Sequence, residues 1–227
     1  MILLSSDYDN TLNTFKLDLK INIYYLKKFI KEGNIFLLNT GRPYKSIKRE
    51  IREYNIPYNY LSCNDGNILF NNSDSILYAS NISDYIYKDL KQLEDKFKMK
   101  IEQIKFLDNV LEFELIISSL NDIFLVELEK IMIKYDLCAK FFKAFGEYHI
   151  YVYQNRINKS TPIEYLKAKY KIASDNIYTV GDHINDFEMI RDYNGYAMKW
   201  AKSEIKEVAS NSCFMVASLI KKIGKRR

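Results

Sequence analysis

Four short apolar runs, each followed at once by polar or charged side chains, limit what this 227-residue chain can fold into more than any other feature. The first run covers residues 2–6 and shows no alternation of apolar and polar side chains. The others cover residues 35–38, 58–63 and 177–180. Uninterrupted runs of this length are typical of strands buried on both faces of a sheet. We therefore predict a sheet that lies inside the protein.

The segments between these runs have helical periodicity. A first helix, ended by Gly33, is predicted from four apolar residues at helical spacing: Leu19, Ile23, Leu26 and Ile30. A second helix is predicted in the same way from Tyr44, Ile47, Ile51 and Tyr54. Residues 66–80 predict a hairpin around the polar turn 71–75. Strands that alternate with helices predict an α/β fold, with a parallel sheet covered by helices.

Residues 81–154 interrupt this alternation. Ser83 can cap a helix that carries Ile86, Leu90, Leu93 and Phe97. Residues 101–117 then alternate, with Glu112 and Glu114 between apolar neighbours, which favours a half-exposed antiparallel sheet. A second helix stripe and two strand runs repeat the order: Leu125, Leu128, Met132 and Tyr135, then 138–142 and 148–153. We predict an inserted α+β domain over 81–154, and a core domain made of 1–80 and 155–227.

The core pattern resumes at Lys159. Thr161 is expected to be the N-cap of a helix, with Pro162 at its first position and Glu164 completing a capping box. This helix therefore begins directly after Lys159. After the fourth apolar run, a further helix begins near Asn185.

Charge, cysteine content and hydropathy narrow the class of protein. The net charge of +5 is partly concentrated in Lys221, Lys222, Lys225, Arg226 and Arg227. This basic tail is expected to be a solvated terminus, with a patch for nucleic acid or another polyanion as the alternative. Three widely spaced cysteines, without any CxxC motif, argue against a disulfide framework or a zinc site. With no secretory signal and no apolar run of membrane-spanning length, we expect a cytoplasmic protein with no membrane partner.

Polar side chains follow each apolar run, at the point where the predicted strand ends. The four groups are Asp7, Asp9 and Thr11; Thr40, Gly41 and Arg42; Asn64, Asp65 and Gly66; and Gly181, Asp182, Asn185 and Asp186. In an open parallel sheet, ligands bind outside the carboxyl ends of the strands, so these groups should converge on one crevice.

The chemistry of that crevice follows from its acids. Crowded carboxylates repel one another unless a cation neutralises them, and oxygen ligands suit Mg²⁺ together with a phosphate oxygen. Two aspartates two residues apart, Asp7 and Asp9, can then serve as nucleophile and as proton donor. Thr40 and backbone N–H groups would hold phosphate oxygens, and Lys159 would offset their charge. The simpler reading is that the two aspartates only cap a turn.

Four motifs in this order, "DYDNT", "NTGR", Lys159 and "GDHIND", resemble those of the haloacid dehalogenase (HAD) superfamily. With the later "GYAM", the chain is similar to the Cof-type sugar phosphatases over essentially its whole length. The resemblance implies a Rossmann-like parallel-sheet core with a small α+β cap inserted between the second and third motifs. Asn10, Asn39 and "NDGN" depart from the pattern common among relatives.

The resemblance also implies roles for individual residues. Asp7 would be the phosphorylated nucleophile, and Asp9 the acid/base. The metal ligands would be Asp7, Asp9 through its carbonyl, and Asp182, and the phosphate-binding residues Thr40, Gly41, Lys159 and Asn185. Asp186 would support the metal. Apart from the resemblance, three neighbouring residues keep two alternatives each: His183 touches substrate or is simply exposed, Arg42 points into the site or pairs with a neighbouring acid, and Asn64 joins the site or forms a turn.

The expected function is that of a Mg²⁺-dependent phosphatase. It would hydrolyse a small phosphorylated metabolite, of the sugar phosphate or phosphoglycolate type, through an aspartyl-phosphate intermediate. The alternatives are a phosphomutase that uses the same intermediate and a non-catalytic binding protein of the same fold. The expected partner is the metabolite rather than nucleic acid, and the protein is expected to be a monomer or a homodimer.

Overall fold

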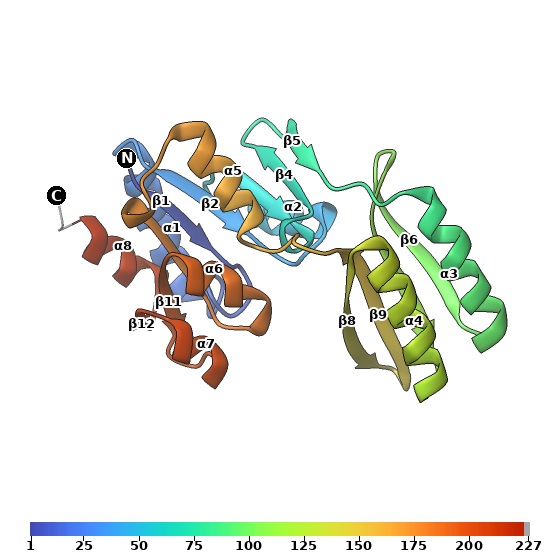
Figure 1. Ribbon diagram of the computed structural model, residues 1–227. Helices are drawn as coiled ribbons and strands as arrows, with labels where there is room; N and C mark the ends of the chain where they lie inside the picture. Colours follow the sequence, from blue (N-terminus) through green and yellow to red (C-terminus); the bar gives the residue numbers. More distant parts are fainter. Residues whose placement is uncertain (225–227) are drawn as a thin grey trace. The chain divides into compact units, whose positions relative to one another are not determined.

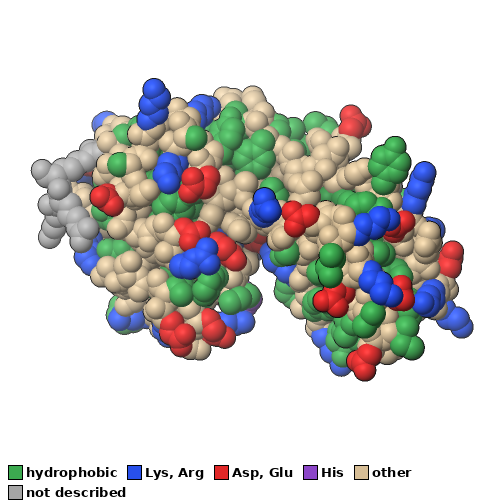
Figure 2. All heavy atoms as spheres, in the orientation of Figure 1, with side chains coloured by type: hydrophobic (Ala, Val, Ile, Leu, Met, Phe, Trp, Pro, Cys, Tyr) green, Lys and Arg blue, Asp and Glu red, His purple; other side chains and the backbone are tan. Residues whose placement is uncertain are grey.

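The computed structural model describes residues 1–224. It divides into two compact units, each with its own sheet (Figure 1). Unit 1 consists of Met1–Tyr78 together with the described residues from Asn158 onward, and unit 2 is Ala79–Ile157. On the face shown in Figure 2, basic and acidic side chains are interspersed, which is typical of a solvated surface. The predicted basic tail falls partly outside the described residues, at Lys225, Arg226 and Arg227.

The larger sheet has eight strands within residues 1–224, in the order β12-β11-β10-β1-β2-β3-β4-β5. Their bounds are β1 (Leu3–Ser6), β2 (Ile35–Asn39), β3 (Tyr60–Cys63), β4 (Ile68–Asn71), β5 (Ile76–Ala79), β10 (Ile177–Gly181), β11 (Asn194–Met198) and β12 (Asn211–Cys213). The strands from β12 to β3 pair in parallel, and β4 runs antiparallel to β3. All residues of β1, β2, β3 and β10 are buried, which confirms the four strands predicted from apolar runs.

Helices connect these strands, as the alternating pattern predicts. They are α1 (Lys16–Lys31), α2 (Tyr44–Tyr54), α5 (Thr161–Tyr170), α6 (Phe187–Asp192), α7 (Ser203–Val208) and α8 (Val216–Gly224). α1 packs against α8, and the Ala217 N–H donates a 2.8 Å hydrogen bond to Asn22 Oδ1 between them. Short 3₁₀ turns cover Asn64–Gly66, Ser174–Asn176 and Ile184–Asp186. The α/β fold class expected from the sequence is confirmed.

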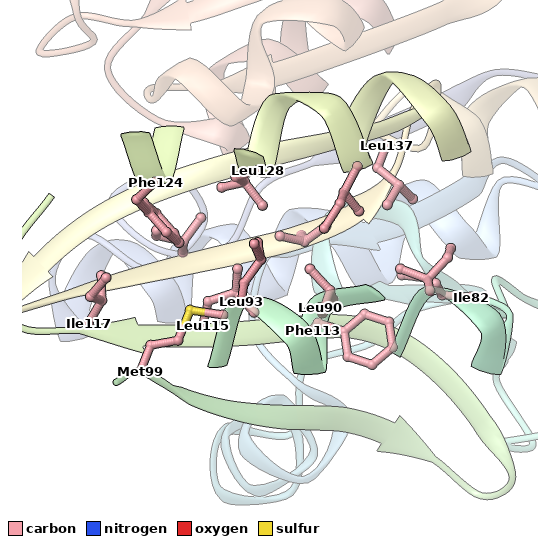
Figure 3. Close-up of a cluster of buried hydrophobic side chains, with 14 of the residues drawn as sticks. Ile82, Leu90, Leu93, Met99, Phe113, Leu115, Ile117, Phe124, Leu128 and Leu137 are labelled. Carbon is pink, nitrogen blue, oxygen red and sulfur yellow. The ribbon is translucent and has the colours of Figure 1, made fainter. Parts of the chain in front are cut away.

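Unit 2 contains helix, strand, strand twice over, in the predicted order. Its elements are α3 (Asp84–Phe97), β6 (Lys100–Phe106), β7 (Asn109–Ile117), α4 (Asp122–Tyr135), β8 (Leu137–Ala144) and β9 (Glu147–Gln154). The strands form an antiparallel sheet in the order β6-β7-β9-β8. In Figure 3, Leu90 and Leu93 of α3 and Leu128 of α4 project onto one face of this sheet. The period-two pattern of β7 places Phe113 and Leu115 in that core.

Two helix details differ from the sequence-based expectation. Thr161 is not the N-cap of α5 but its first helical residue, and the cap position, Ser160, makes no side-chain capping bond. The Thr161 hydroxyl instead accepts a 3.1 Å hydrogen bond from the Asn158 N–H, so it stabilises the preceding turn. In α4 the predicted stripe is also misplaced, because Phe124 is buried while Leu125 is 37% exposed. Either residue could begin an apolar stripe with helical spacing, and packing against the sheet decides that Phe124 is the buried one.

Phe113→Ala is expected to destabilise unit 2 by about 3–5 kcal/mol, because the fully buried ring leaves a cavity between the sheet and α3. Urea denaturation followed by circular dichroism measures this change. Leu107→Ala is the control, since Leu107 is 73% exposed and its loss should change the free energy of unfolding by less than about 0.5 kcal/mol. Equal effects from both variants would contradict this description of the core.

Candidate active site

The ends of adjacent parallel strands bring the predicted residues together in unit 1. The Asp7 N–H, directly after β1, donates a 3.0 Å hydrogen bond to the Val180 carbonyl of β10. This parallel register places Asp182 beside Asp7. A cavity of about 280 Å³ opens there, lined by Asp7, Asp9, Asn10, Gly41, Arg42, Asp182, His183 and Asn185.

Three aspartates form a buried cluster at this cavity. Carboxylate oxygens of Asp7, Asp182 and Asp186 all lie within 4.8 Å of one another. Thr11 donates a 3.0 Å hydrogen bond from its hydroxyl to Asp182 Oδ1. Burial raises the pKa of the Asp7 carboxyl to about 8, although Lys159 acts in the opposite direction. Burial also raises the pKa of Asp182.

Asp186 differs from Asp7 and Asp182 because both of its carboxylate oxygens accept hydrogen bonds from the protein. Its Oδ2 accepts the backbone N–H groups of Asp182 and His183 at 2.9 and 3.0 Å, and its Oδ1 accepts from Lys159 at 2.6 Å. Gly181 allows this carboxylate to approach, since a Cβ there would lie 2.4 Å from the Asp186 side chain. Asp186 therefore supports the loop and Lys159, and support of a metal by this residue stays a prediction.

Lys159 is fully buried between two carboxylates. Its ammonium lies 2.6 Å from Asp7 and 2.6 Å from Asp186, and 4.0 Å from Asp65. These carboxylates raise the pKa of Lys159 although burial alone would lower it. Asn39 holds the backbone beneath, because its buried amide donates a 2.7 Å hydrogen bond to the Lys159 carbonyl. In the sequence Asn39 is only a departure from the pattern common among relatives, and this contact gives it a structural role.

The loop after β2 carries Thr40 and Gly41. Thr40 is buried, and its hydroxyl accepts a 3.1 Å hydrogen bond from the Arg42 N–H. A Cβ on Gly41 would lie 2.9 Å from Asp65 Oδ1, so this position keeps the two loops close together. Thr40 and Gly41 thus lie at the strand ends where a phosphate-binding role was predicted.

The loop after β3 contains Asp65, which the sequence placed at a strand end without an individual role in the site. Asn64, Asp65 and Gly66 all have positive φ angles, of 51°, 51° and 99°. This left-handed turn directs Asp65 Oδ1 to Asn185, whose amide donates a 2.8 Å hydrogen bond to it. The expectation favoured Asn64, but the Asn64 contacts described here run through its backbone. The sequence Asn-Asp-Gly predicts a turn wherever it occurs, so it does not indicate which side chain enters the site.

Asp9 is not part of the aspartate cluster. Its half-exposed carboxylate forms an ion pair with Arg42, at 2.6 and 2.7 Å. Arg42 therefore pairs with a neighbouring acid, as one alternative proposed, and it also lines the cavity. Asn10 follows with a positive φ of 55°, and the Trp200 indole donates a 2.8 Å hydrogen bond to its carbonyl. His183 is exposed at the rim of the cavity.

The donor set fits a divalent cation with oxygen ligands. Asp7 and Asp182 each use one carboxylate oxygen in the hydrogen bonds above, and the described residues place no hydrogen bond on the other. Two free carboxylate oxygens at the mouth of a cavity suit Mg²⁺, which is usually bound by one or two carboxylates with water and phosphate oxygens. Asp7 and Asp182 would hold it through these oxygens, and the Asp9 carbonyl stays a predicted ligand.

Addition of Mg²⁺ is expected to raise the melting temperature. At a hundredfold excess over the dissociation constant, the stabilisation is about 2.7 kcal/mol, or roughly 5–10 °C for a chain of this size. The rise should be larger at pH 8 than at pH 6, because the raised pKa values of Asp7 and Asp182 make the cation compete with protons. Thermal denaturation of Asp182→Asn should show most of the rise lost, and exposed Asp175→Asn should keep it. An unchanged rise in Asp182→Asn would contradict this assignment.

Comparison with known proteins identifies the family. The profile of the haloacid dehalogenase-like hydrolases matches residues 4–112 and 85–215. The chain belongs to this family. A curated relative of this HAD-like hydrolase, an uncharacterized protein of Mycoplasma capricolum subsp. capricolum, is 26% identical over 88% of this chain and 92% of its own length. The superfamily resemblance of the four motifs is thereby confirmed.

Solved structures share the fold of this HAD-like hydrolase. A phosphatase of the HAD enzyme superfamily from Bacteroides thetaiotaomicron has a TM-score of 0.78 at 17% identity, covering 99% of this chain and 94% of that one. A HAD/COF-like hydrolase from Plasmodium vivax has a TM-score of 0.72 at 19% identity, covering 100% and 96%. A HAD subclass IIB sugar phosphatase has a TM-score of 0.73 at 16% identity, covering 99% of both chains.

Among residues 1–224, none of the helices combines the length and apolar character needed to cross a bilayer.

Proposed function

We propose that this HAD-like hydrolase is a Mg²⁺-dependent phosphatase that acts on small phosphorylated metabolites through an aspartyl-phosphate intermediate. The observation that carries the proposal is the position of Asp7, whose carboxylate lies beside buried Lys159 and Asp182 at the edge of a cavity. This places a nucleophile next to positive charge and to a cation-binding oxygen set.

The reaction divides between Asp7 and Asp9. An Asp7 oxygen attacks phosphorus while the bond from phosphorus to the leaving oxygen breaks, and the protonated carboxyl of Asp9 gives its proton to this oxygen. Asp9 then accepts a proton from water as the water attacks the phosphoryl group and frees Asp7. Lys159 offsets the negative charge of the phosphoryl oxygens throughout, and Thr40 and Gly41 would hold them at the adjacent strand end. Mg²⁺, when bound, would neutralise further phosphate charge.

The proposal assigns the two units different tasks. Unit 1 carries all of the residues with proposed catalytic roles. Unit 2 would serve as the cap that selects the substrate, as predicted for residues 81–154. A sugar phosphatase neighbour of the same fold supports a sugar phosphate as the substrate, and a phosphoglycolate-type substrate is the alternative. The three free cysteines, Cys63, Cys138 and Cys213, support the further proposal of a cytoplasmic location.

Release of inorganic phosphate from a panel of about a hundred phosphorylated metabolites, with Mg²⁺ or with a chelator, tests the proposal. We expect phosphate release from a subset of phosphomonoesters, lost on chelation. Analysis of the organic product separates hydrolysis from a mutase reaction, because a mutase yields an isomeric phosphate and no free phosphate. Absence of turnover over the whole panel, from protein that binds Mg²⁺, would count against an enzyme and in favour of a binding protein.

A further inference from the structure

The Arg42 guanidinium, which holds Asp9, is itself fixed by two other side chains. Its Nη1 lies 3.2 Å from Glu50 Oε1, and the guanidinium lies over the Tyr8 ring, 5.0 Å from the centroid. Tyr8 donates a 2.8 Å hydrogen bond from its hydroxyl to Glu50 Oε2. Both oxygens of Glu50 are therefore used, one for each partner.

Tyr8 connects Glu50 to the loop that follows β1 and carries Asp9. It is fully buried although it stands between Asp7 and Asp9, and its hydroxyl also accepts a 3.0 Å hydrogen bond from the Asn13 amide. Asn13 pairs with Asp9 through a backbone bridge. Glu50, from the middle of α2, thus connects to both ends of the loop that carries Asp9.

An isolated ion pair with this exposure would be a weak constraint. The side chains of Arg42 and Asp9 are 29% and 47% exposed, and solvent screens such pairs so that they contribute little to stability. Bidentate geometry within a network is the exception, because a planar guanidinium that is held on three sides leaves the carboxylate few orientations. Glu50 is what distinguishes this network from a surface pair.

We propose that Glu50 is a positioning residue for the phosphatase reaction, which acts by fixing Arg42 and, through it, the Asp9 carboxylate. The inference rests on the proposed function, since it concerns the proton that Asp9 transfers. A displacement of about 1 Å in a catalytic group can cost about a hundredfold in rate. A side chain that touches neither substrate nor reacting atoms can therefore control the rate of the step that needs the proton.

The proposal has a signature that depends on the leaving group. An alkyl phosphate needs a proton on its leaving oxygen, whereas p-nitrophenolate leaves as a stable anion. The ratio kcat/KM reports formation of the aspartyl-phosphate for both. In Glu50→Leu, kcat/KM for an alkyl phosphate such as glycerol phosphate should fall about tenfold or more, part of the 10²–10⁴-fold that a general acid supplies. For p-nitrophenyl phosphate it should change by less than about twofold.

Two further variants complete the experiment. Glu50→Gln keeps an oxygen that can accept from Arg42, so it should recover part of the alkyl phosphate activity, and it serves if Glu50→Leu fails to fold. Glu53→Leu, an exposed position on the same helix, is the matched control and should change neither substrate. An equal loss with both substrates, or no loss with either, would overturn the positioning role.

A crystal structure of Glu50→Leu provides a readout that does not depend on turnover. We expect Arg42 to leave the bidentate position and Asp9 to change its rotamer. An unchanged Asp9–Arg42 pair overturns the inference whatever the activity. Wild-type protein that releases phosphate from neither ester contradicts the proposed function instead, and the crystallographic comparison then decides the role of Glu50.

Discussion

Asp7→Asn is expected to abolish phosphate release, with kcat reduced by about 10⁴-fold or more, because an amide cannot form the acyl phosphate. The substitution keeps the size of the side chain, and Lys159 keeps its 2.6 Å contact with Asp186. The fold should therefore persist. Rapid-quench or steady-state phosphate assays measure the loss, and circular dichroism checks the fold.

The pH dependence of stability gives an independent check on Asp7. Burial raises the pKa of its carboxyl from the usual value to about 8, so the folded chain binds a proton that the unfolded chain has lost. Without Mg²⁺, this contribution to the free energy of unfolding is present at pH 4 and is lost as the pH rises through 8. Asp7→Asn has no such proton, so its stability relative to wild type should rise over that range.

A fully active, folded Asp7→Asn protein would refute the nucleophile assignment.

Lys159→Met is expected to have the second largest effect, on both stability and turnover. It removes the only described cation within 4.0 Å of Asp7 and Asp186 and leaves these two carboxylates buried without a counter-charge. Loss of one partner from such a buried group costs about 3–5 kcal/mol. Phosphate release should also fall by about 10²-fold or more, since nothing replaces the charge that offsets the phosphoryl oxygens.

Urea denaturation with and without Mg²⁺ tests this second prediction. Because Mg²⁺ supplies positive charge to the same carboxylates, it should restore part of the stability of Lys159→Met but little of its activity. Lys48→Met is the matched control. Lys48 is also buried, but it lies in α2, outside the cavity. Its ammonium contacts Asp74 at 2.8 Å and the Tyr58 hydroxyl at 2.9 Å. It should lose stability but keep its turnover per folded molecule. Unchanged stability in Lys159→Met would contradict the charge balance described here.

Much of the fold could be predicted from local patterns of apolar and polar residues. β1 and β10 could be predicted because a strand buried on both faces needs an uninterrupted apolar run. The burial of Leu90 in a helix and of Phe113 in a strand of unit 2 could be predicted in the same way, from periods of 3.6 and 2 residues. β12 was not predicted individually, because its three residues, two of which are exposed, are too few to show a periodic pattern.

Sequence alone determined that the carboxylates Asp7 and Asp182 stand at the ends of buried strands, because residue order and apolar runs are local properties of the chain. Only the tertiary structure decided which side chains meet there. It placed Asp65 rather than Asn64 against Asn185, joined Asn39 to the Lys159 carbonyl 120 positions away, and set Glu50 behind Arg42. Such contacts depend on strand register, left-handed turns and the packing of distant helices, and no short stretch of sequence contains that information.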